Sequence, residues 1–429
     1  MGLREEYMKN IVIINAYGKK NIGDATILYV ALEMLNSVLD RGVGINLMLV
    51  DKDSYSLKLK IFQKVSFFQS PYGYAIKSAK LPVSQLVKIV RFFIIYILST
   101  TYIFLGKFSG RLFPNKGFYS YITSIYQSEI VISMGGGYLT TKNKVRDYFG
   151  LLLSLLPIYI AKFYKKRILF LPMSFGPFVS KYHQSLTYNA AKNTTILCRD
   201  DIALKEVKKL FSNDKTTKVL YCPDLALFYS SKKKSNLHQK FGSNYIVLTA
   251  REWLPDAKQI QFEESLAKFI DFIAMKYNLN TIFIPMAWNH IEDDDNRVAK
   301  RIKTFVKSTN SFTIVNAKSP IEVQEILRNA KLAICTRMHS AILATTVNTP
   351  FIAIGYVYKT LGFVQKMNLE KYYMDIAEVS YEKLIKEFSN IINPKNYQKV
   401  YSQLIEKNQE IHIYKKLIRE EIRKVINNT

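Results

Sequence analysis

Short apolar runs rich in β-branched residues alternate with amphipathic stretches along most of the chain. The pattern predicts strands at Ile11–Ala16, Ile45–Val50, Ile130–Met134, Arg167–Pro172, Thr195–Cys198, Val219–Cys222, Tyr245–Thr249, Thr281–Pro285, Phe312–Val315, Leu332–Cys335 and Phe351–Ile354. Helices are predicted between most of these strands, as at Ala25–Leu39, Asp201–Leu210, Ile260–Lys276, Asp293–Val306, Ile321–Arg328 and Ser340–Thr346. Strands that alternate with helices form parallel sheets through right-handed crossovers. The pattern therefore predicts an α/β fold.

The length of the chain indicates more than one domain. Its 429 residues exceed what one hydrophobic core usually serves. The alternation restarts after the polar segment Ser230–Asn244, which we interpret as a linker. We expect two doubly wound domains, residues 1–230 and 245–390, and a helical tail, residues 391–429. Such domains would place a ligand cleft between them, at the carboxyl ends of the strands.

The chain is strongly basic. Lys and Arg number 61 against 34 Asp and Glu, a formal charge of +27, which implies an anionic partner such as nucleic acid, anionic lipid or a phosphorylated substrate. The three cysteines, Cys198, Cys222 and Cys335, are far apart and have no CxxC spacing. This pattern argues against a disulfide framework or a metal site and favours a reducing cytoplasm. The start of the chain does not have the pattern of a signal peptide.

Residues 54–128 combine basic and apolar character. They contain ten Lys or Arg residues and no Asp or Glu, and they include the apolar run Phe92–Leu105. That run is shorter than the roughly 20 residues that a spanning helix needs. Basic side chains are drawn to anionic headgroups, so we interpret this region as a helical insertion that contacts an anionic membrane surface. A buried helix or oligomer interface, and a true span, are the alternatives.

Glycines follow two of the predicted strands in the first domain. The motif "NAYGKKNIGDATIL" places Gly18, Asn21 and Gly23 in a turn, with Asp24 positioned to cap the next helix. Free backbone N–H groups at such a turn suit an anion, although the motif is neither GxGxxG nor a Walker A loop. Turn chemistry alone explains it equally well.

The motif "ISMGGGYL" contains Gly135, Gly136 and Gly137 at the end of a strand. Glycines at such a place bring the backbone close to either a ligand or another chain.

Charged residues follow several other strands. Arg199 is placed where a strand gives way to a helix, with a salt bridge to Asp200 or Asp201 as the alternative interpretation. Further cleft candidates at strand ends or in loops are Asp224, Arg251 and His290. The triplet Asp293–Asp295 is adequately explained by capping of a helix N-terminus.

The segment "KLAICTRMHSAILATTVNTPFIAIGYVYKTLG" carries the strongest local signal. One strand delivers Arg337 and His339 to its carboxyl end, and the next strand delivers Lys359 to the same edge. Residues 326–369 contain no Asp or Glu. Cations at a helix N-terminus form an anion site, and His339 beside fixed cations should favour its neutral form and exchange a proton near neutral pH. The alternative is a capping histidine with surface lysines.

Taken in order, these motifs resemble the polysaccharide pyruvyl transferase family over roughly residues 11–370. The matching elements are "GKKNIGDATIL", "SMGGGYL", "CRDDIAL", "CPDLALF", "LTARE", "HIEDDDNRVAK" and "TRMHSAILATTVNTPFIAIGYVYK". The resemblance implies two Rossmann-like domains that face each other across a cleft, a GT-B-like fold. It also implies transfer of pyruvate from phosphoenolpyruvate to a sugar hydroxyl pair, forming a ketal.

The family pattern assigns roles to four residues. Arg199 and Arg337 would hold the carboxylate and phosphate of the donor, Lys359 would be an added cation, and His339 would be the general acid and base. No metal or cofactor is implied, because phosphoenolpyruvate is itself the donor substrate. The acceptor would be a sugar or a lipid-linked glycan, at the cytoplasmic face of the cell membrane.

Two other functions compete with this interpretation. A GT-B nucleotide-sugar glycosyltransferase would share the fold, but many retaining members place carboxylates in the second domain, where residues 326–369 have none. A non-catalytic or nucleic-acid-binding protein would use the positive charge as its binding surface. Because the charge lies partly beside apolar residues, lipid is favoured over nucleic acid.

Overall fold

The computed structural model describes residues 10–40, 43–52, 65–76, 85–105, 116–141, 145–231, 240–242, 244–288 and 294–427. The chain divides into two compact units. Unit 1 comprises residues 1–18, 27–224 and 416–429, and unit 2 comprises residues 19–26 and 225–415. The short segment 19–26 therefore belongs to unit 2, although it follows the first strand of unit 1.

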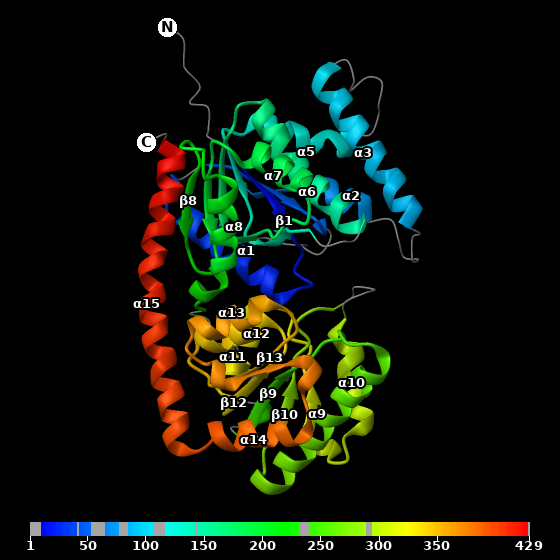
Figure 1. The fold of residues 1–429 in the computed structure, drawn as a ribbon, viewed down its shortest axis with the longest axis vertical. Coiled ribbons are helices and arrows are strands. Elements are labelled where there is room, and N and C mark those ends of the chain that lie inside the picture. The colour runs from blue at the N-terminus through cyan, green and yellow to red at the C-terminus, as the bar shows by residue number, and fades with distance from the viewer. Residues whose placement is uncertain are drawn as a thin grey trace. The chain divides into compact units, whose positions relative to one another are not determined.

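Unit 1 is built on a parallel sheet (Figure 1). Its strands are β1 (Ile11–Ala16), β2 (Ile45–Leu49), β3 (Val65–Gln69), β4 (Ile130–Ser133), β5 (Gly136–Leu139), β6 (Arg167–Phe175), β7 (Thr195–Cys198) and β8 (Lys218–Tyr221). The strand order is β3-β2-β1-β4-β6-β7-β8, and β5 pairs with β6. All six residues of β1 are buried, as expected for a central strand covered on both faces.

Helices cover the sheet of unit 1 in layers (Figure 1). They are α1 (Ile22–Asn36), which begins in unit 2, α2 (Pro71–Ile76), α3 (Gln85–Leu105), α5 (Lys116–Gln127), α6 (Val145–Phe163), α7 (Lys181–Ala191) and α8 (Asp201–Leu210). Helix α6 packs against β4, β5 and β6, and α3 packs against α2, α5 and α6. Helix α3 is thus separated from the sheet by other helices.

Part of the region 54–128 belongs to the sheet. Strand β3 pairs in parallel with β2 and extends the sheet at its edge, a strand that the sequence interpretation did not include. The apolar run Phe92–Leu105 forms most of α3. Within the described residues, every helix falls short of the length and apolar character that crossing a bilayer demands.

Unit 2 is also built on a parallel sheet. Its strands are β9 (Tyr245–Thr249), β10 (Asn280–Phe283), β11 (Phe312–Ile314), β12 (Leu332–Cys335), β13 (Phe351–Gly355) and β14 (Tyr373–Asp375). Its helices are α9 (Asp256–Tyr277), α10 (Asp295–Phe305), α11 (Pro320–Arg328), α12 (Met338–Thr346), α13 (Tyr358–Lys366), α14 (Tyr381–Ile391) and most of α15 (Pro394–Asn427). The strand order β11-β10-β9-β12-β13-β14 is that of a Rossmann fold, numbered 3-2-1-4-5-6 from β9.

The end of α15 belongs to unit 1. There the guanidinium of Arg167 donates hydrogen bonds to the carbonyls of Val425 and Ile426, at 2.7 and 2.8 Å. The ammonium of Lys218, at the start of β8, bonds to Glu421 at 2.6 Å. These contacts fasten the last turns of the chain to the edge of the first sheet.

Candidate functional site

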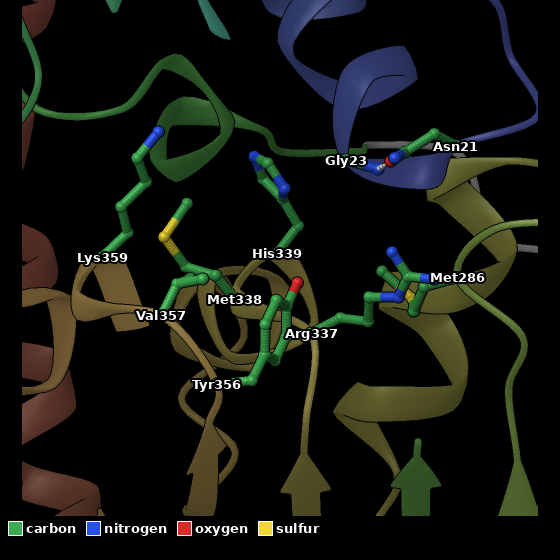
Figure 2. Close-up of a pocket in the computed structure, with 9 residues that line it drawn as sticks. All are labelled: Asn21, Gly23, Met286, Arg337, Met338, His339, Tyr356, Val357 and Lys359. Carbon is green, nitrogen blue, oxygen red and sulfur yellow. Dashed lines mark hydrogen bonds between the residues drawn. The ribbon is translucent and has the colours of Figure 1, made fainter. Parts of the chain in front are cut away.

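The candidate site lies where two neighbouring strands of unit 2 end. Strands β12 and β13 pair in parallel, so the helices that follow them, α12 and α13, begin at the same edge of the sheet. Arg337 occupies the N-cap position of α12, His339 its first turn, and Lys359 the first turn of α13. All three line one pocket of about 140 Å³ (Figure 2). The structure thus brings together the three residues that the sequence placed at one edge.

The remaining walls of the pocket come from two loops. Its lining is Asn21, Gly23, Met286, Arg337, Met338, His339, Tyr356, Val357 and Lys359. The segment 19–26 is hydrogen-bonded to the loop after β10: the amide of Ile22 donates to the carbonyl of Met286 at 2.9 Å, and the amide of Trp288 donates to the carbonyl of Lys20 at 3.1 Å. Backbone pairing across these loops positions the first glycine motif at the site of unit 2.

Asn21, rather than Asp24, caps helix α1. The side-chain oxygen of Asn21 accepts hydrogen bonds from the amides of Gly23 and Asp24, at 2.9 and 3.3 Å. The helix begins at Ile22, one residue after this cap, and Asp24 lies in its first turn. Our expectation that Asp24 is the cap is therefore wrong, because the cap must precede the first helical residue. The sequence indicated the turn correctly but placed its cap three residues too late.

Gly23 lies directly against the imidazole of His339. A Cβ atom built on Gly23 would fall less than 3.0 Å from three atoms of His339, among them Nδ1 and Cγ. The glycine is needed for this close approach and not for an unusual backbone conformation, since it lies in the first turn of a helix. The contact fixes one side of the imidazole.

Arg337 forms a buried ion pair with Asp295. Its Nη2 and Nε donate to the two carboxylate oxygens of Asp295, at 2.6 and 3.2 Å, and the side chains are 8% and 1% exposed. Asp295 also accepts hydrogen bonds from the amides of Met286 and Ala287, at 2.9 and 3.1 Å. Two of the guanidinium nitrogens are therefore committed to a protein carboxylate, which orients the side chain rigidly.

The interpretation of the whole Asp triplet as helix capping is therefore incomplete. Asp294 is the N-cap of α10 and bonds to the amide of Asn296 at 2.9 Å, as expected. Asp295 instead holds Arg337, 42 residues away in sequence. Nothing in the local pattern distinguishes these two aspartates, because the partner of Asp295 follows β12, which is separated from β10 in the sheet by β9. Asp295 is the functional candidate that sequence reasoning missed.

Arg251 acts on the pocket through Tyr356. Its Nη1 donates a 2.7 Å hydrogen bond to the hydroxyl of Tyr356. Its guanidinium carbon lies 4.5 Å from the centroid of the Tyr356 ring and 5.0 Å from that of Trp253. Arg251 follows β9 and Tyr356 follows β13, so again two strand ends supply one cluster. Arg251 is not among the residues that line the pocket, but it fixes one that is.

The candidates of unit 1 form a second cluster. Arg199 donates from Nη1 to Asp224 at 2.6 Å and from Nε to the hydroxyl of Ser174 at 2.9 Å, and both members of the ion pair are 7% exposed. Asp200 accepts a hydrogen bond from Ser174 at 2.6 Å and caps α8. The partner of Arg199 is thus Asp224, from the motif "CPDLALF", whereas the sequence suggested Asp200 or Asp201. Arg199 belongs to unit 1, and Arg337 to unit 2.

Two glycines of unit 1 are explained by the structure, one by packing and one by its backbone conformation. A Cβ on Gly135 would lie 2.6 Å from the carbonyl oxygen of Pro172 in β6, so this glycine admits a neighbouring strand. Gly136 has a φ of +145°, which other residues rarely adopt. Gly137 is exposed at the start of β5, and Gly18 lies at the end of the first stretch of unit 1. His290 lies outside the described residues.

Neither a metal cluster nor a reactive thiol is found among the described residues. They contain no group of three or more His, Cys, Asp or Glu side chains that could hold a metal ion. Cys198, Cys222 and Cys335 are buried as free thiols, and burial raises the pKa of each to about 12. Thiols with such pKa values are poor nucleophiles near neutrality.

Comparison with known proteins points to one family. The model of the polysaccharide pyruvyl transferase family matches residues 21–357, which is more than half of the chain. Among curated proteins, the amylovoran biosynthesis protein AmsJ of Erwinia amylovora is 23% identical over 294 residues, covering 65% of this chain and 68% of AmsJ.

Two solved structures show the breadth of the fold. S. aureus MnaA in a co-structure with UDP has a TM-score of 0.59 and 13% identity, covering 98% of this chain and 97% of that chain. A UDP-forming α,α-trehalose-phosphate synthase from Burkholderia xenovorans has a TM-score of 0.54 and 10% identity, covering 97% of this chain and 99% of that chain. These likenesses confirm a GT-B-like fold of two Rossmann-like domains, which hosts several activities. The family match separates this chain from those neighbours: it belongs to the polysaccharide pyruvyl transferase family.

Proposed function

We propose that the protein transfers a pyruvyl group from phosphoenolpyruvate to two hydroxyls of one sugar, forming a pyruvate ketal. The acceptor is part of a cell-surface polysaccharide or of its lipid-linked precursor. Family membership supports the reaction class. The observation that carries the proposal is the pocket in unit 2, which Arg337, His339 and Lys359 line together at the starts of two helices.

The pocket suits a small anion. Phosphoenolpyruvate carries a phosphate and a carboxylate, and helix N-termini with adjacent cations favour both groups. Asp295 already accepts hydrogen bonds from two nitrogens of Arg337 and offsets its positive charge. We therefore assign Arg337 the role of an oriented hydrogen-bond donor to phosphoenolpyruvate, with little net charge in the pair. Lys359, which is half-buried in the first turn of α13, then supplies much of the charge that attracts the phosphate. The volume of about 140 Å³ favours a compact acid over the larger ligands for which pockets of roughly 300–1,000 Å³ are usual.

The proposed reaction needs one group that first donates a proton to phosphoenolpyruvate and then accepts a proton from a sugar hydroxyl. Protonation of the methylene carbon of phosphoenolpyruvate makes an oxocarbenium-like centre at C2. One sugar hydroxyl attacks C2 and loses its proton, the C2–O bond to phosphate breaks, and the second hydroxyl attacks C2 and loses its proton. The products are a ketal with one carboxylate and hydrogen phosphate, so that atoms and charge are conserved. No oxidant or reductant is consumed.

We assign the proton transfers to His339. Imidazole can both donate and accept a proton near neutral pH, and such catalysis contributes about 10²–10⁴-fold to rate. The contact with Gly23 holds the ring from one side. The hydroxyl of Tyr356, held by Arg251, is a further polar group at the pocket that can orient the donor or an acceptor hydroxyl.

The experiment that tests the proposal starts from ligand-induced stabilisation of the purified chain. A ligand at 100 times its Kd raises the free energy of unfolding by about 2.7 kcal/mol. We expect phosphoenolpyruvate to raise the thermal midpoint and a panel of UDP-sugars to leave it unchanged. Stabilisation by UDP-sugars alone would instead favour the glycosyltransferase function, which the UDP-bound and UDP-forming fold neighbours keep as the second candidate.

The chemistry is tested with acceptor glycans. We expect release of phosphate together with a new ketal methyl signal in the NMR spectrum of the product. His339→Gln should abolish both signals while phosphoenolpyruvate still stabilises the protein. His412→Gln is the matched control, since His412 is an exposed residue of α15. Normal turnover by His339→Gln would refute the assignment of His339.

A further inference from the structure

Helix α3 of unit 1 has two apolar faces, and the first is buried. Phe92 and Ile95 are each 4% exposed and Ser99 is fully buried. The ring of Phe92 lies 4.8 Å from that of Phe149 in α6, centroid to centroid, and the hydroxyls of Ser99 and Tyr121 are hydrogen-bonded. These residues anchor α3 to the helices beneath it.

The second apolar face points away from the domain core. Val90, Phe93, Ile94, Tyr96 and Ile97, which we call the outer face, are 49%, 52%, 49%, 45% and 59% exposed. Helices on the surface of soluble proteins normally present polar residues on the side opposite the core. Here that side is occupied by large apolar and aromatic residues, and α3 lies at the margin of unit 1, beyond α5 and α6 (Figure 1). Apolar clusters of this kind mark interaction surfaces.

Aromatic rings extend the outer face onto neighbouring helices. The ring of Phe93 lies 6.2 Å from that of Phe149, which lies 5.6 Å from that of Tyr148. Tyr148 in turn stacks on Tyr182 of α7 at 6.1 Å, and Tyr182 is 57% exposed. Tyrosines, with an apolar ring and a polar hydroxyl, are enriched at the level of lipid headgroups. The exposed apolar surface therefore continues from the aliphatic residues of α3 to the tyrosines of α6 and α7.

The charge of the surrounding sequence favours an anionic occupant. Residues 54–128, which include all of α3, carry ten Lys or Arg residues and no Asp or Glu. A second copy would bring the same basic sequence, which has no acidic residue between positions 54 and 128 to complement the charge of the first. An anionic bilayer supplies both the negative charge and the apolar layer, with about 1 kcal/mol for each basic residue near its surface.

We propose that the outer face of α3 docks the protein onto anionic membrane surfaces, with its apolar side chains at the boundary between headgroups and acyl chains. The helix lies along the membrane and does not cross it. This surface is separate from the proposed transfer reaction, because vesicle binding requires neither donor nor acceptor. A membrane-docked enzyme is also suited to a lipid-linked acceptor, a link that depends on the proposed function.

Vesicle flotation of the full chain tests the proposal. The probes are phosphatidylcholine vesicles with and without phosphatidylglycerol. We expect binding to the anionic vesicles, weak binding to the neutral ones, and a decline between roughly 0.1 and 1 M salt, where the Debye length falls from about 10 to 3 Å. The double variant Ile94→Gln, Ile97→Gln should bind anionic vesicles at least about tenfold more weakly, because binding scales with buried apolar area.

The matched control is Met275→Gln, Ile413→Gln, which changes two apolar residues of unit 2 that are 80% and 74% exposed. It should bind vesicles like the wild type, and circular dichroism should show both variants folded. No binding by the wild type, or equal binding by the α3 variant, would overturn the proposal. So would a dimer in analytical ultracentrifugation that dissociates when Ile94 and Ile97 are replaced, since the face would then be an interface between copies.

Discussion

The backbone of Gly23 and the imidazole of His339 touch with no room for another atom between them. These residues are far apart in the sequence and meet because the segment 19–26 is hydrogen-bonded to the loop that follows β10. A methyl group at position 23 would require the ring to move. The position of the proposed general acid and base therefore depends on the absence of a side chain.

Gly23→Ala is expected to lower activity much more than it lowers the stability of the fold. Alanine in a helix is favoured over glycine by about 1 kcal/mol, which offsets part of the cost of displacing His339, so stability should change less than activity. The displaced imidazole should lower kcat by about a hundredfold, the effect of a misplacement of about 1 Å. Steady-state kinetics and thermal denaturation measure both quantities. The control is Gly362→Ala in α13, where an added Cβ meets no atom within 4 Å and activity should be unchanged.

Asp295→Ala should both destabilise unit 2 and disturb donor binding. It leaves the guanidinium of Arg337, whose side chain is 8% exposed, without its carboxylate partner. Breaking a buried ion pair in this way costs about 3–5 kcal/mol. Chemical denaturation measures the loss. Lys383→Ala, which breaks an ion pair whose side chains are 51% and 69% exposed, should cost no more than about 1 kcal/mol. Equal losses in the two variants would contradict this assignment.

Arg199 and Asp224 should behave as a coupled pair in unit 1. Each single replacement by alanine leaves one buried charge unpaired and should cost about 3–5 kcal/mol. The double variant removes both charges and should be less destabilising than the sum of the singles, with a coupling energy of about 0.5–3 kcal/mol. Denaturant unfolding of all four proteins completes the cycle. If the losses of the two single variants simply added up in the double variant, the ion pair would contribute little to stability.

The attachment of the C-terminal turns to β8 should weaken in acid. Burial raises the pKa of Glu421, but hydrogen bonds from Lys218 and Lys424 outweigh it and hold that pKa below its ordinary value of 4.5. A lowered pKa in the folded state adds stability that is present above the ordinary value and is lost as the pH falls through the folded one. The protection of the amides of residues 416–427 against hydrogen exchange, relative to their intrinsic rate at each pH, should therefore fall below about pH 4.

Two variants check the role of Glu421 in this acid response. Glu421→Gln should lose most of the pH dependence, because the amide does not titrate. Glu406→Gln, on the exposed side of the same helix, should retain it. An unchanged acid response in Glu421→Gln would exclude this carboxylate as its source.

The alternation of apolar runs predicts most of the sheets, because buried parallel strands are continuous apolar segments. Strands β1, β7, β9 and β12 have the bounds expected from the sequence. Strand β6 continues past Pro172 to Phe175, where the expected strand ended at the proline. Its pairing with β7 shifts register between Phe170 and Met173, and such an irregularity accommodates a residue that lacks an N–H. Strands β5 and β14 lack the continuous apolar run of the other strands, since β5 begins with two glycines and β14 ends in an aspartate.

The site is predictable as far as strand ends are predictable. Arg337, His339 and Lys359 follow apolar strands closely, so their place at one edge of the sheet can be read from the order of the elements. The Asp295 carboxylate and the Tyr356 hydroxyl are fixed instead by partners on other strands, Arg337 and Arg251. Contacts between distant loops leave no periodic signal in the sequence, so the quoted motifs contain these two residues but their roles emerge only from the structure.

The pocket of unit 2 is encoded at two distant places in the gene. Codons 19–26 lie within the part that encodes unit 1, whereas the other lining residues come from codons 286–359. A chimera that exchanges only the second half between two relatives would join a glycine loop from one parent to a histidine from the other. A chimera should therefore acquire the substrate preference of one parent only when both gene segments come from that parent.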